Sequence, residues 1–305
     1  MQPVRGILFK IGSVTIFIIM SSMIKAASSE VPPGQMVFFR SFFAIPVILA
    51  WVRWQGDLRG GIRVQNPLGH FWRGLMGTSA MALGFTGLGL LPLPEVTAIG
   101  YAAPLLTVVF AAMFLGEAVR AFRLTAVALG LVGVMIVLSP RLSVLSQGGM
   151  QVLETLGAVV VLMGAVCSAL AQVFLRRLVQ TERTSAVVFW FSVTSSTLAL
   201  FTVPFGWVWP SPQAATLLVC AGLLGGLGQI LLTSSYRHAD ASVVAPFEYV
   251  SMIFALTIGY FIFDEIPTLA MLGGAGLIIL AGVLIIWRER QLGLERTRQR
   301  KAMTP

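Results

Sequence analysis

Two stretches of the chain repeat one pattern, and this repeat decides the fold class. Residues 101–117 read YAAPLLTVVFAAMFLGE, and residues 249–265 read YVSMIFALTIGYFIFDE. Each stretch begins with a tyrosine and reaches a glutamate sixteen residues later, so a shift of 148 residues superposes both pairs. Between these ends the two stretches are almost wholly apolar. A pattern that recurs at a long period indicates two copies of one structural unit.

The composition excludes most classes of soluble protein. Of the 305 residues, 57% are hydrophobic and only 11% are charged, whereas an ordinary soluble domain carries about 25% charged residues. So few charges are not typical of a soluble enzyme, a disordered chain or a disulfide-rich secreted scaffold. The composition therefore predicts an all-α integral membrane protein.

The apolar residues fall into ten runs, each close to the about 20 residues that a membrane-spanning helix needs. The runs cover residues 7–26, 35–54, 72–91, 95–115, 122–139, 154–175, 185–204, 213–235, 241–263 and 268–287. Pro46, Pro104 and Pro246 lie inside runs, where they predict kinks or unwound turns. We therefore expect ten transmembrane helices.

The basic residues predict the orientation of these helices. With a cytoplasmic N-terminus, all of the 21 basic residues except Lys25, Arg40 and Arg141 fall on the cytoplasmic side. Lys10 and Arg73 are counted there, at the ends of their runs. This bias predicts that both termini are cytoplasmic and that the number of helices is even. A signal peptide cleaved near residues 26–29 is the alternative, and it would leave nine helices.

The repeat and the topology together predict two inverted halves. Residues 5–140 and 150–288 each hold five runs, and residues 289–305 form a basic cytoplasmic tail. Because five is an odd number, two halves of like fold must insert in opposite orientations. Such inverted repeats are typical of secondary transporters, whose substrate site lies near the membrane midplane at the interface of the repeats.

Several short motifs resemble the EamA-type branch of the drug/metabolite transporter superfamily. They include the arginine of Phe38-Phe39-Arg40-Ser41-Phe42-Phe43 and the segments Leu91–Ala98, Ala103-Pro104, Phe114–Glu117, Ala239–Ser242 and Asp264-Glu265. Where many members carry a proline in the ninth helix, this chain has Ser251. The earlier proline of Ala245–Tyr249 resembles the subgroup of S-adenosylmethionine and riboflavin uptake carriers. The resemblance spans about residues 5–288 and implies ten helices in two repeats and a transport function.

Glu248 is the strongest candidate for a functional residue. A charge at the centre of a bilayer costs about 2.5–3.5 kcal/mol on insertion scales, so such a group is expected to face the bundle interior. Glu248 shares one helical face with Ser251, Ala255 and Gly259, and small residues mark contact between helices rather than contact with lipid. Glu248 is therefore expected to point inward, as a proton acceptor, a counter-ion for a cationic substrate, or a structural partner for an arginine.

Further candidates are polar or aromatic residues within the runs. Arg40 is expected to pair with Glu248, to bind a substrate anion or to extend to the outer surface, and Lys25 is expected at the membrane interface. Gln172 and Gln229 are candidates for lining a polar cavity, with an interhelical hydrogen bond as the alternative. Tyr101 and Tyr249 are candidates for stacking on a planar ligand or for core packing. Stripes of small residues accompany them: Gly77, Ala80 and Gly84; Gly164 and Ser168; Gly222 and Gly226.

We therefore expect a secondary active transporter of a small organic metabolite in the inner (plasma) membrane, either an uptake carrier or an exporter. A membrane-embedded lipid-modifying enzyme and a channel are the alternatives. No catalytic motif, metal site or other cofactor is predicted. The low charge within the runs argues against a strongly anionic cargo. The expected partners are the substrate and the lipid bilayer, with a proton as candidate coupling ion, a homodimer as candidate assembly and no nucleic acid.

Overall fold

The computed structural model describes residues 3–56, 58–115, 121–142, 150–239 and 244–302, and none of these residues forms a strand. The helices of the first half are α1 (Pro3–Ala27), α2 (Pro33–Phe42), α3 (Ala44–Trp54), α4 (Leu58–Gly61), α5 (Pro67–Leu90), α6 (Leu93–Gly100), α7 (Ala102–Leu115) and α8 (Ala121–Leu142). Those of the second half are α9 (Met150–Thr181), α10 (Thr184–Leu200), η1 (Val203–Phe205), α11 (Pro212–His238), η2 (Ala245–Tyr249), α13 (Val250–Phe263) and α14 (Leu269–Ala302). Glu117 and residues 240–242, which contribute to the predicted motifs, lie outside the described residues.

Many of these helices have the length and composition of membrane spans. Within the described ranges, five segments are long and apolar enough to cross a membrane: Val4–Ala27, Pro33–Trp54, Leu93–Phe110, Val152–Thr181 and Pro212–His238. Shorter apolar helices cover Leu124–Pro140, Thr184–Leu200, Phe247–Phe263 and Leu269–Leu284. The chain is thus an all-helical, multi-pass membrane protein in the part that the structure describes.

The three internal prolines coincide with interruptions of the helices. Proline lacks an N–H and its ring clashes with the carbonyl four residues earlier, so a helix breaks just before it. The run 35–54 is divided at Phe43, three residues before Pro46, and the run 95–115 is divided at Tyr101, three residues before Pro104. In the run 241–263, Pro246 lies in the short 3-10 turn η2, which directly precedes α13. The predicted kinks are confirmed at all three places, and two of them border the cavity described below.

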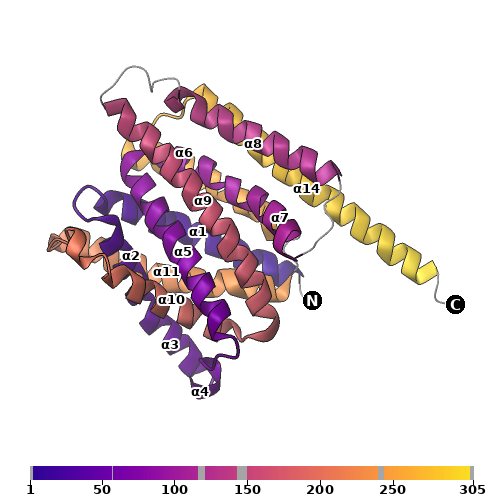
Figure 1. Cartoon of the computed structure of the whole chain (residues 1–305), viewed down its shortest axis with the longest axis horizontal. Coiled ribbons are helices and arrows are strands. Elements are labelled where there is room, and N and C mark those ends of the chain that lie inside the picture. Colours follow the sequence, from indigo (N-terminus) through magenta and orange to yellow (C-terminus); the bar gives the residue numbers. More distant parts are fainter. Residues whose placement is uncertain (1–2, 57, 116–120, 143–149, 240–243, 303–305) are drawn as a thin grey trace.

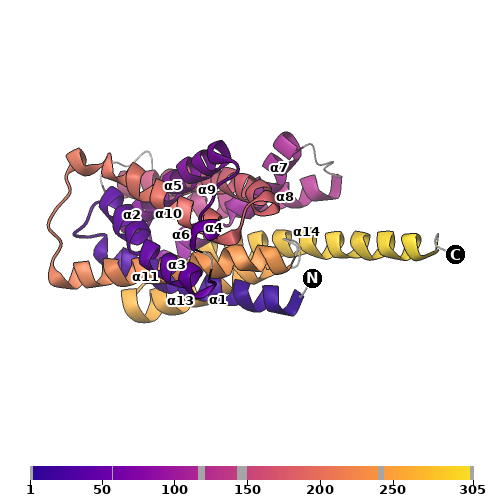
Figure 2. The same cartoon turned by 90° about the horizontal axis from the view of Figure 1, so that it is seen from below.

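The helices pack as pairs that join the two halves of the chain (Figures 1 and 2). The most extensive contacts are those of α1 with α11, of α5 with α9 and of α8 with α14. Glycine allows the last pair to approach closely, because a Cβ atom on Gly133 would lie 2.8 Å from the carbonyl oxygen of Gly274, and one on Gly274 would lie 2.6 Å from that of Gly133. Small residues at such crossings are typical of helices packed within membranes.

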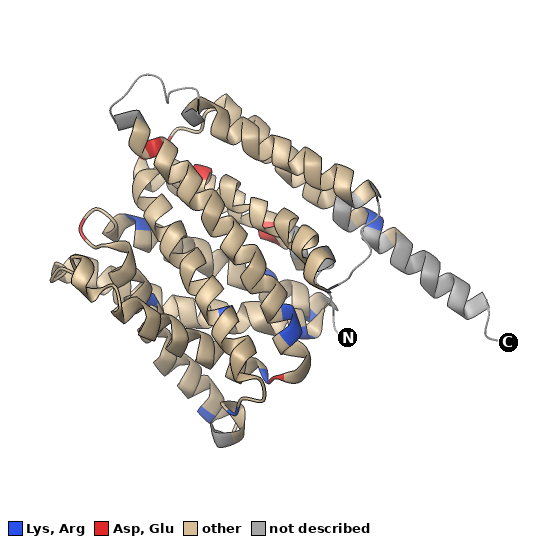
Figure 3. Ribbon diagram, in the orientation of Figure 1, with Lys and Arg blue, Asp and Glu red and all other residues tan. Residues whose placement is uncertain are grey.

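Charged residues are sparse along the helices (Figure 3). The start of α1 and the last turns of α14 lie toward the same side of the molecule, and α14 extends beyond the bundle there (Figure 1). A few charged side chains nevertheless lie deep inside, including Lys10, Arg40 and Arg73. Because an isolated buried charge is costly, these side chains mark the places where function is to be sought.

Candidate binding site

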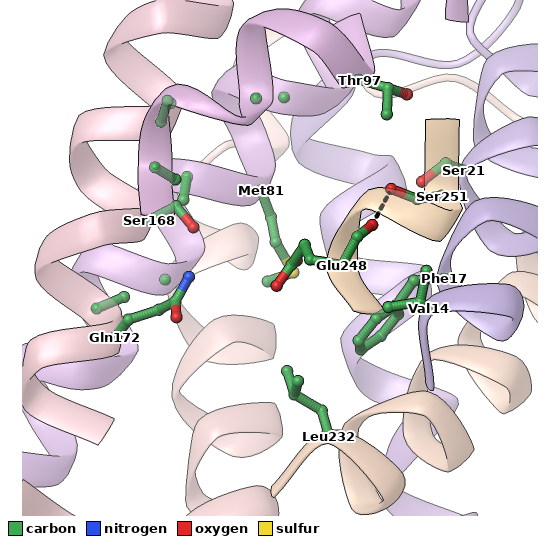
Figure 4. A pocket seen from close by; sticks show the side chains of 18 of the residues that line it. Val14, Phe17, Ser21, Met81, Thr97, Ser168, Gln172, Leu232, Glu248 and Ser251 are labelled. Carbon is green, nitrogen blue, oxygen red and sulfur yellow. Dashed lines mark hydrogen bonds between the residues drawn. The ribbon is translucent and has the colours of Figure 1, made fainter. Parts of the chain in front are cut away.

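A cavity of about 410 Å³ lies at the centre of the bundle, between the two halves of the chain. This volume is within the usual range for small-molecule sites, about 300–1,000 Å³. Helices α1, α5 and α6 of the first half and α9, α11 and α13 of the second half contribute to its wall. Figure 4 shows Glu248 projecting into the open space, with Gln172 and Ser168 facing it from α9. Most of the wall is apolar, so its few polar groups determine what it can bind.

Lys10 and Glu248 form an ion pair in the cavity wall. Lys10 Nζ lies 2.6 Å from Glu248 Oε2, although the two residues are 238 positions apart in the chain. The Lys10 side chain is only 1% exposed, whereas that of Glu248 is 33% exposed. Glu248 is held in η2, where the interrupted helix turns its side chain toward the cavity. The carboxylate therefore meets a cation on one side and open space on the other.

The position of Lys10 corrects its prediction as a cytoplasmic charge at the end of a run. Lys10, Val14, Phe17 and Ser21 all line the cavity from α1. Their spacing of four, three and four residues places them on one helical face. That spacing was the sequence signal that Lys10 faces inward, because it places the lysine on the same helical face as Ser21, a polar residue deeper in the same run.

Two arginines line the cavity together. Arg40 is in the last turn of α2 and Arg73 is in α5, and their residues are 3% and 6% exposed. Arg40 Cζ lies 5.6 Å and Arg73 Cζ 4.0 Å from the centroid of the Phe191 ring. Phe191 belongs to α10 in the second half of the chain. Both guanidinium groups thus lie against the same aromatic ring.

This arrangement corrects two expectations. Arg73 was expected at the cytoplasmic end of its run, but it extends the stripe of Gly77, Ala80 and Gly84 by one helical turn into the cavity. Arg40 is buried rather than extended to the surface, and the carboxylate of Glu248 pairs with Lys10 instead. Both arginines make the cavity more basic than the low charge of the runs suggested, which removes the argument against an anionic cargo.

The predicted amides, Gln172 and Gln229, both line the cavity. Gln172 Oε1 accepts a long hydrogen bond of 3.5 Å from the hydroxyl of Tyr236. The Nε2 atom of Gln229 is buried and has no hydrogen-bond partner within the described ranges. Gly222 and Gly226, on the same face as Gln229, pack instead against Phe43 and Ala44, at the break between α2 and α3.

The predicted tyrosines meet each other. The rings of Tyr101 and Tyr249 are in edge contact, with their centroids 5.0 Å apart. The hydroxyl of Tyr101 forms a 2.7 Å hydrogen bond with that of Ser251, and Tyr101 lines the cavity. Tyr249 is not part of the cavity lining, because its ring packs against Tyr101 and fills the space beside Gly282. A ligand in the cavity would therefore contact Tyr101 directly and Tyr249 only through it.

A second ion pair closes one end of the bundle. Lys25 Nζ lies 2.9 Å from Glu265 Oε1, and it also donates hydrogen bonds to the carbonyl oxygens of Leu88 and Leu91. Glu265 Oε2 accepts a hydrogen bond from the backbone N–H of Leu93. Lys25 is therefore largely buried in a network of polar contacts at this end of the bundle, and its location at the membrane interface stays a prediction. The network joins the end of α1 to the α5–α6 connection and to the segment after α13.

No group of three or more metal-ligating side chains occurs within the ranges that the structure covers. The cavity offers the Lys10–Glu248 ion pair, arginine donors, amides and several aromatic rings. These groups suit the binding of a polar organic molecule.

The sequence of the chain matches a known family over most of its length. Residues 4–139 and residues 155–287 each match the model of the EamA-like transporter family. The chain belongs to this family. It is therefore a membrane transporter and not an enzyme, as the motifs predicted.

Two proteins that are similar to this chain over most of their length differ in the function that their names state. The S-adenosylmethionine uptake transporter of Rickettsia bellii (strain RML369-C) is 27% identical over 269 residues, which cover 88% of this chain and 89% of that protein. The pseudopaline exporter of Pseudomonas aeruginosa (strain UCBPP-PA14) is 26% identical over 281 residues, which cover 92% of this chain and 95% of that protein. One relative is named for uptake and the other for export, so similarity alone decides neither the direction nor the substrate.

A solved crystal structure supports the fold. It superposes with a TM-score of 0.67 at 20% sequence identity, and the alignment covers 93% of this chain and 97% of the other. At this level of identity the likeness concerns the fold alone.

Proposed function

We propose that this EamA-like protein is a secondary active carrier that moves a small organic metabolite across the plasma membrane by alternating access. The observation that carries the proposal is the central cavity. Both halves of the chain contribute to its wall, and the Lys10–Glu248 ion pair within the wall joins the two halves. A carrier of this kind holds its substrate at the interface of two repeats and opens that site to one side at a time.

The packing of the helices supports two inverted repeats of five spans each. In this scheme α1 corresponds to α9 and α5 corresponds to α11, so the pair α1–α11 corresponds to the pair α9–α5. Both pairs have extensive contacts, as does the self-corresponding pair of α8 and α14. Tyr101 and Tyr249, which the 148-residue shift superposes, touch each other. Contact between corresponding residues is expected where a two-fold axis passes through the molecule.

The Lys10–Glu248 pair can couple the binding of a proton or substrate to the relative movement of the two halves. Lys10 belongs to the first half and Glu248 to the second, so the ion pair bridges the halves that alternating access must separate. A proton or a cationic group of the substrate that neutralises Glu248 would release Lys10. Uptake of an S-adenosylmethionine-like or riboflavin-like solute coupled to protons is the version that we favour. Export of amino acids, metabolites or drugs is the alternative.

The test uses full-length protein in proteoliposomes, with counterflow of a radiolabelled panel. The panel contains S-adenosylmethionine, riboflavin, amino acids and cationic drugs, each assayed at mildly acidic and mildly alkaline pH. A carrier predicts saturable counterflow of at least one compound. Linear, non-saturable flux, or no counterflow of any compound by folded protein, contradicts the proposal.

The variant Glu248→Gln tests the coupling residue. We expect it to abolish the pH dependence of transport and to lower stability by about 1–3 kcal/mol, because Lys10 then lacks its charged partner. The double variant Lys10→Met/Glu248→Gln is expected to regain stability in thermal unfolding but not transport. Glu154→Gln, in α9 outside the cavity lining, is the control. Wild-type transport by Glu248→Gln at every pH would show that the pair is only structural.

A further inference from the structure

We propose that Arg40 and Arg73 form a subsite for a carboxylate, so that the cargo is a metabolite of amino-acid type with a carboxylate at this end of the cavity. The inference rests on the proposed carrier function, because it assumes that the cavity holds the cargo. It adds a named ligand group and the residues that recognise it.

The first argument is that both guanidinium groups are buried and incompletely satisfied. The Nε and Nη1 atoms of Arg40 and of Arg73 are buried, and none of these four atoms has a hydrogen-bond partner within the described residues. An arginine remains charged at any physiological pH. Buried charges in proteins are ordinarily paired and hydrogen-bonded, because leaving them otherwise is costly. Two neighbouring arginines with free donors therefore indicate a binding partner that is absent from the protein itself.

The second argument is that the surroundings hold both guanidinium groups against one aromatic ring, that of Phe191. The Phe191 ring attracts both cations, with its centroid 4.0 Å from Arg73 Cζ and 5.6 Å from Arg40 Cζ. Glycines leave the necessary room, since a Cβ atom on Gly77 would lie 2.5 Å from Arg73 Nη1, and one on Gly225 would lie 3.0 Å from Arg40 Nε. The Phe191 ring holds the guanidinium groups in place but supplies no negative charge.

The third argument is the balance of charge around the cavity. Lys10, Arg40, Arg73 and Glu248 are the charged residues of the described lining, and Glu248 is already paired with Lys10. The lining therefore has an excess of positive charge, and this excess lies at the arginines. An anionic group on the cargo would neutralise it.

A carboxylate suits this subsite better than a phosphate. Arginine presents planar, forked donors that bind a carboxylate through two parallel hydrogen bonds. Glu248 shares the cavity and would repel a doubly charged anion more than a zwitterion. An α-amino acid carries its carboxylate and its ammonium group on one carbon, so the carboxylate can bind the arginines while the ammonium group offsets the repulsion by Glu248.

The test measures the thermal stability of purified full-length protein with matched probes. The probes are S-adenosylmethionine and its decarboxylated form, L-methionine and L-methioninamide, and inorganic phosphate. We expect stabilisation by the carboxylate member of at least one pair and not by its partner. Arg73→Gln and Arg40→Gln are expected to weaken that binding by about 10- to 100-fold, the range for loss of a charge-assisted hydrogen bond. Arg53→Gln, at an exposed position of α3, is the control and should bind normally.

Two further variants keep the test independent of folding defects. Arg73→Lys and Arg40→Lys retain the charge but not the planar fork, and they are expected to bind the carboxylate more weakly than wild type while unfolding normally. Equal binding by both members of every pair, stabilisation by phosphate alone, or no response to any carboxylate would each overturn the subsite.

The outcome is separable from that of the carrier proposal. Saturable counterflow without selectivity for a carboxylate would overturn the subsite and leave the carrier. Arginine-dependent, carboxylate-selective stabilisation without counterflow would support the subsite and overturn the carrier.

Discussion

At the scale of single residues, Gly77 leaves the space in which an arginine and an aromatic ring meet. A Cβ atom at this position would lie 2.5 Å from Arg73 Nη1 and 2.6 Å from Phe191 Cε2. Gly84 belongs to the same stripe two turns later and also lines the cavity, yet a Cβ atom there would meet nothing within 4 Å. Two glycines of one stripe therefore have different physical roles, which spacing alone does not reveal.

Substitution of these two glycines tests the difference. Gly77→Ala is expected to displace the Arg73 guanidinium and to reduce transport by about tenfold or more, since small misplacements of binding groups are costly. Gly84→Ala is expected to leave the Arg73 guanidinium in place, to reduce transport less than Gly77→Ala does, and to stabilise the helix by about 0.5–1 kcal/mol. Counterflow rates and thermal unfolding of both variants measure these effects. Equal loss of transport in both would show that the stripe acts only as a sliding surface.

At the scale of the elements, side chains tie helix ends together at the loops. Ser211 precedes α11 and its hydroxyl accepts a hydrogen bond from the backbone N–H of Ala214, which caps the helix. The same hydroxyl donates to Glu30 Oε2 at 2.7 Å, and the backbone N–H of Ser211 donates to Glu30 Oε1. The turn after α1 is thereby joined to the start of α11, with which α1 makes one of its most extensive contacts.

The Glu30–Ser211 contact predicts a pH-dependent contribution to stability. Hydrogen bonds from the backbone N–H and then the hydroxyl of Ser211 lower the pKa of Glu30 below its ordinary value of 4.5. A lowered pKa in the folded state means that the stabilisation is present above pH 4.5 and is lost as the pH falls through the lowered pKa.

Thermal unfolding of Glu30→Gln in detergent checks this contribution. We expect the variant to unfold at a lower temperature than wild type at neutral pH, with the difference shrinking below pH 4.5. Ser28→Ala, which alters the same turn without removing a hydrogen bond to Glu30, should show no such convergence. A difference that is constant with pH would mean that the contact acts through packing rather than through charge.

At the scale of the whole molecule, each of the following loop contacts joins two segments that are predicted to lie on the same side of the membrane. The contacts Lys25–Glu265, Glu30–Ser211 and Gln35–Val208 all join segments that the charge bias predicts to be outside. Glu182 accepts hydrogen bonds from the backbone of Gln65 and Asn66, which the same bias predicts to be cytoplasmic. Contacts across the predicted sides would have contradicted the alternation of spans.

Cysteine labelling in intact cells tests the proposed orientation. In a background without the free cysteines Cys167 and Cys220, Trp209→Cys should react with a membrane-impermeant maleimide, because Trp209 is 99% exposed in a loop proposed to be outside. Arg53→Cys, at the proposed cytoplasmic end of α3, should react only after lysis. The reverse pattern would invert the topology, and labelling of both in intact cells would contradict the five spans predicted between the two positions.

Local patterns along the chain determined the class of the protein and part of its site. The length of the apolar runs and the scarcity of charge specified a helical membrane protein, because both properties are local. The prolines placed the helix breaks, since proline acts on the carbonyl four residues earlier. The inward direction of Glu248 also followed from local spacing. Arg40, Gln172, Gln229 and Tyr101 were candidates as polar or aromatic residues within the runs, and all of them line the cavity.

Only the tertiary structure decided which charges meet. Lys10 and Arg73 are close to the ends of apolar runs, and counting charges by their distance from those ends assigned both to the cytoplasm. Their helical faces turn them into the cavity, where Lys10 reaches Glu248 across 238 residues of sequence. The pairing of Lys25 with Glu265 and the shared ring of Phe191 likewise join distant helices. Such contacts depend on how helices rotate and cross, and the sequence near any one residue does not contain that information.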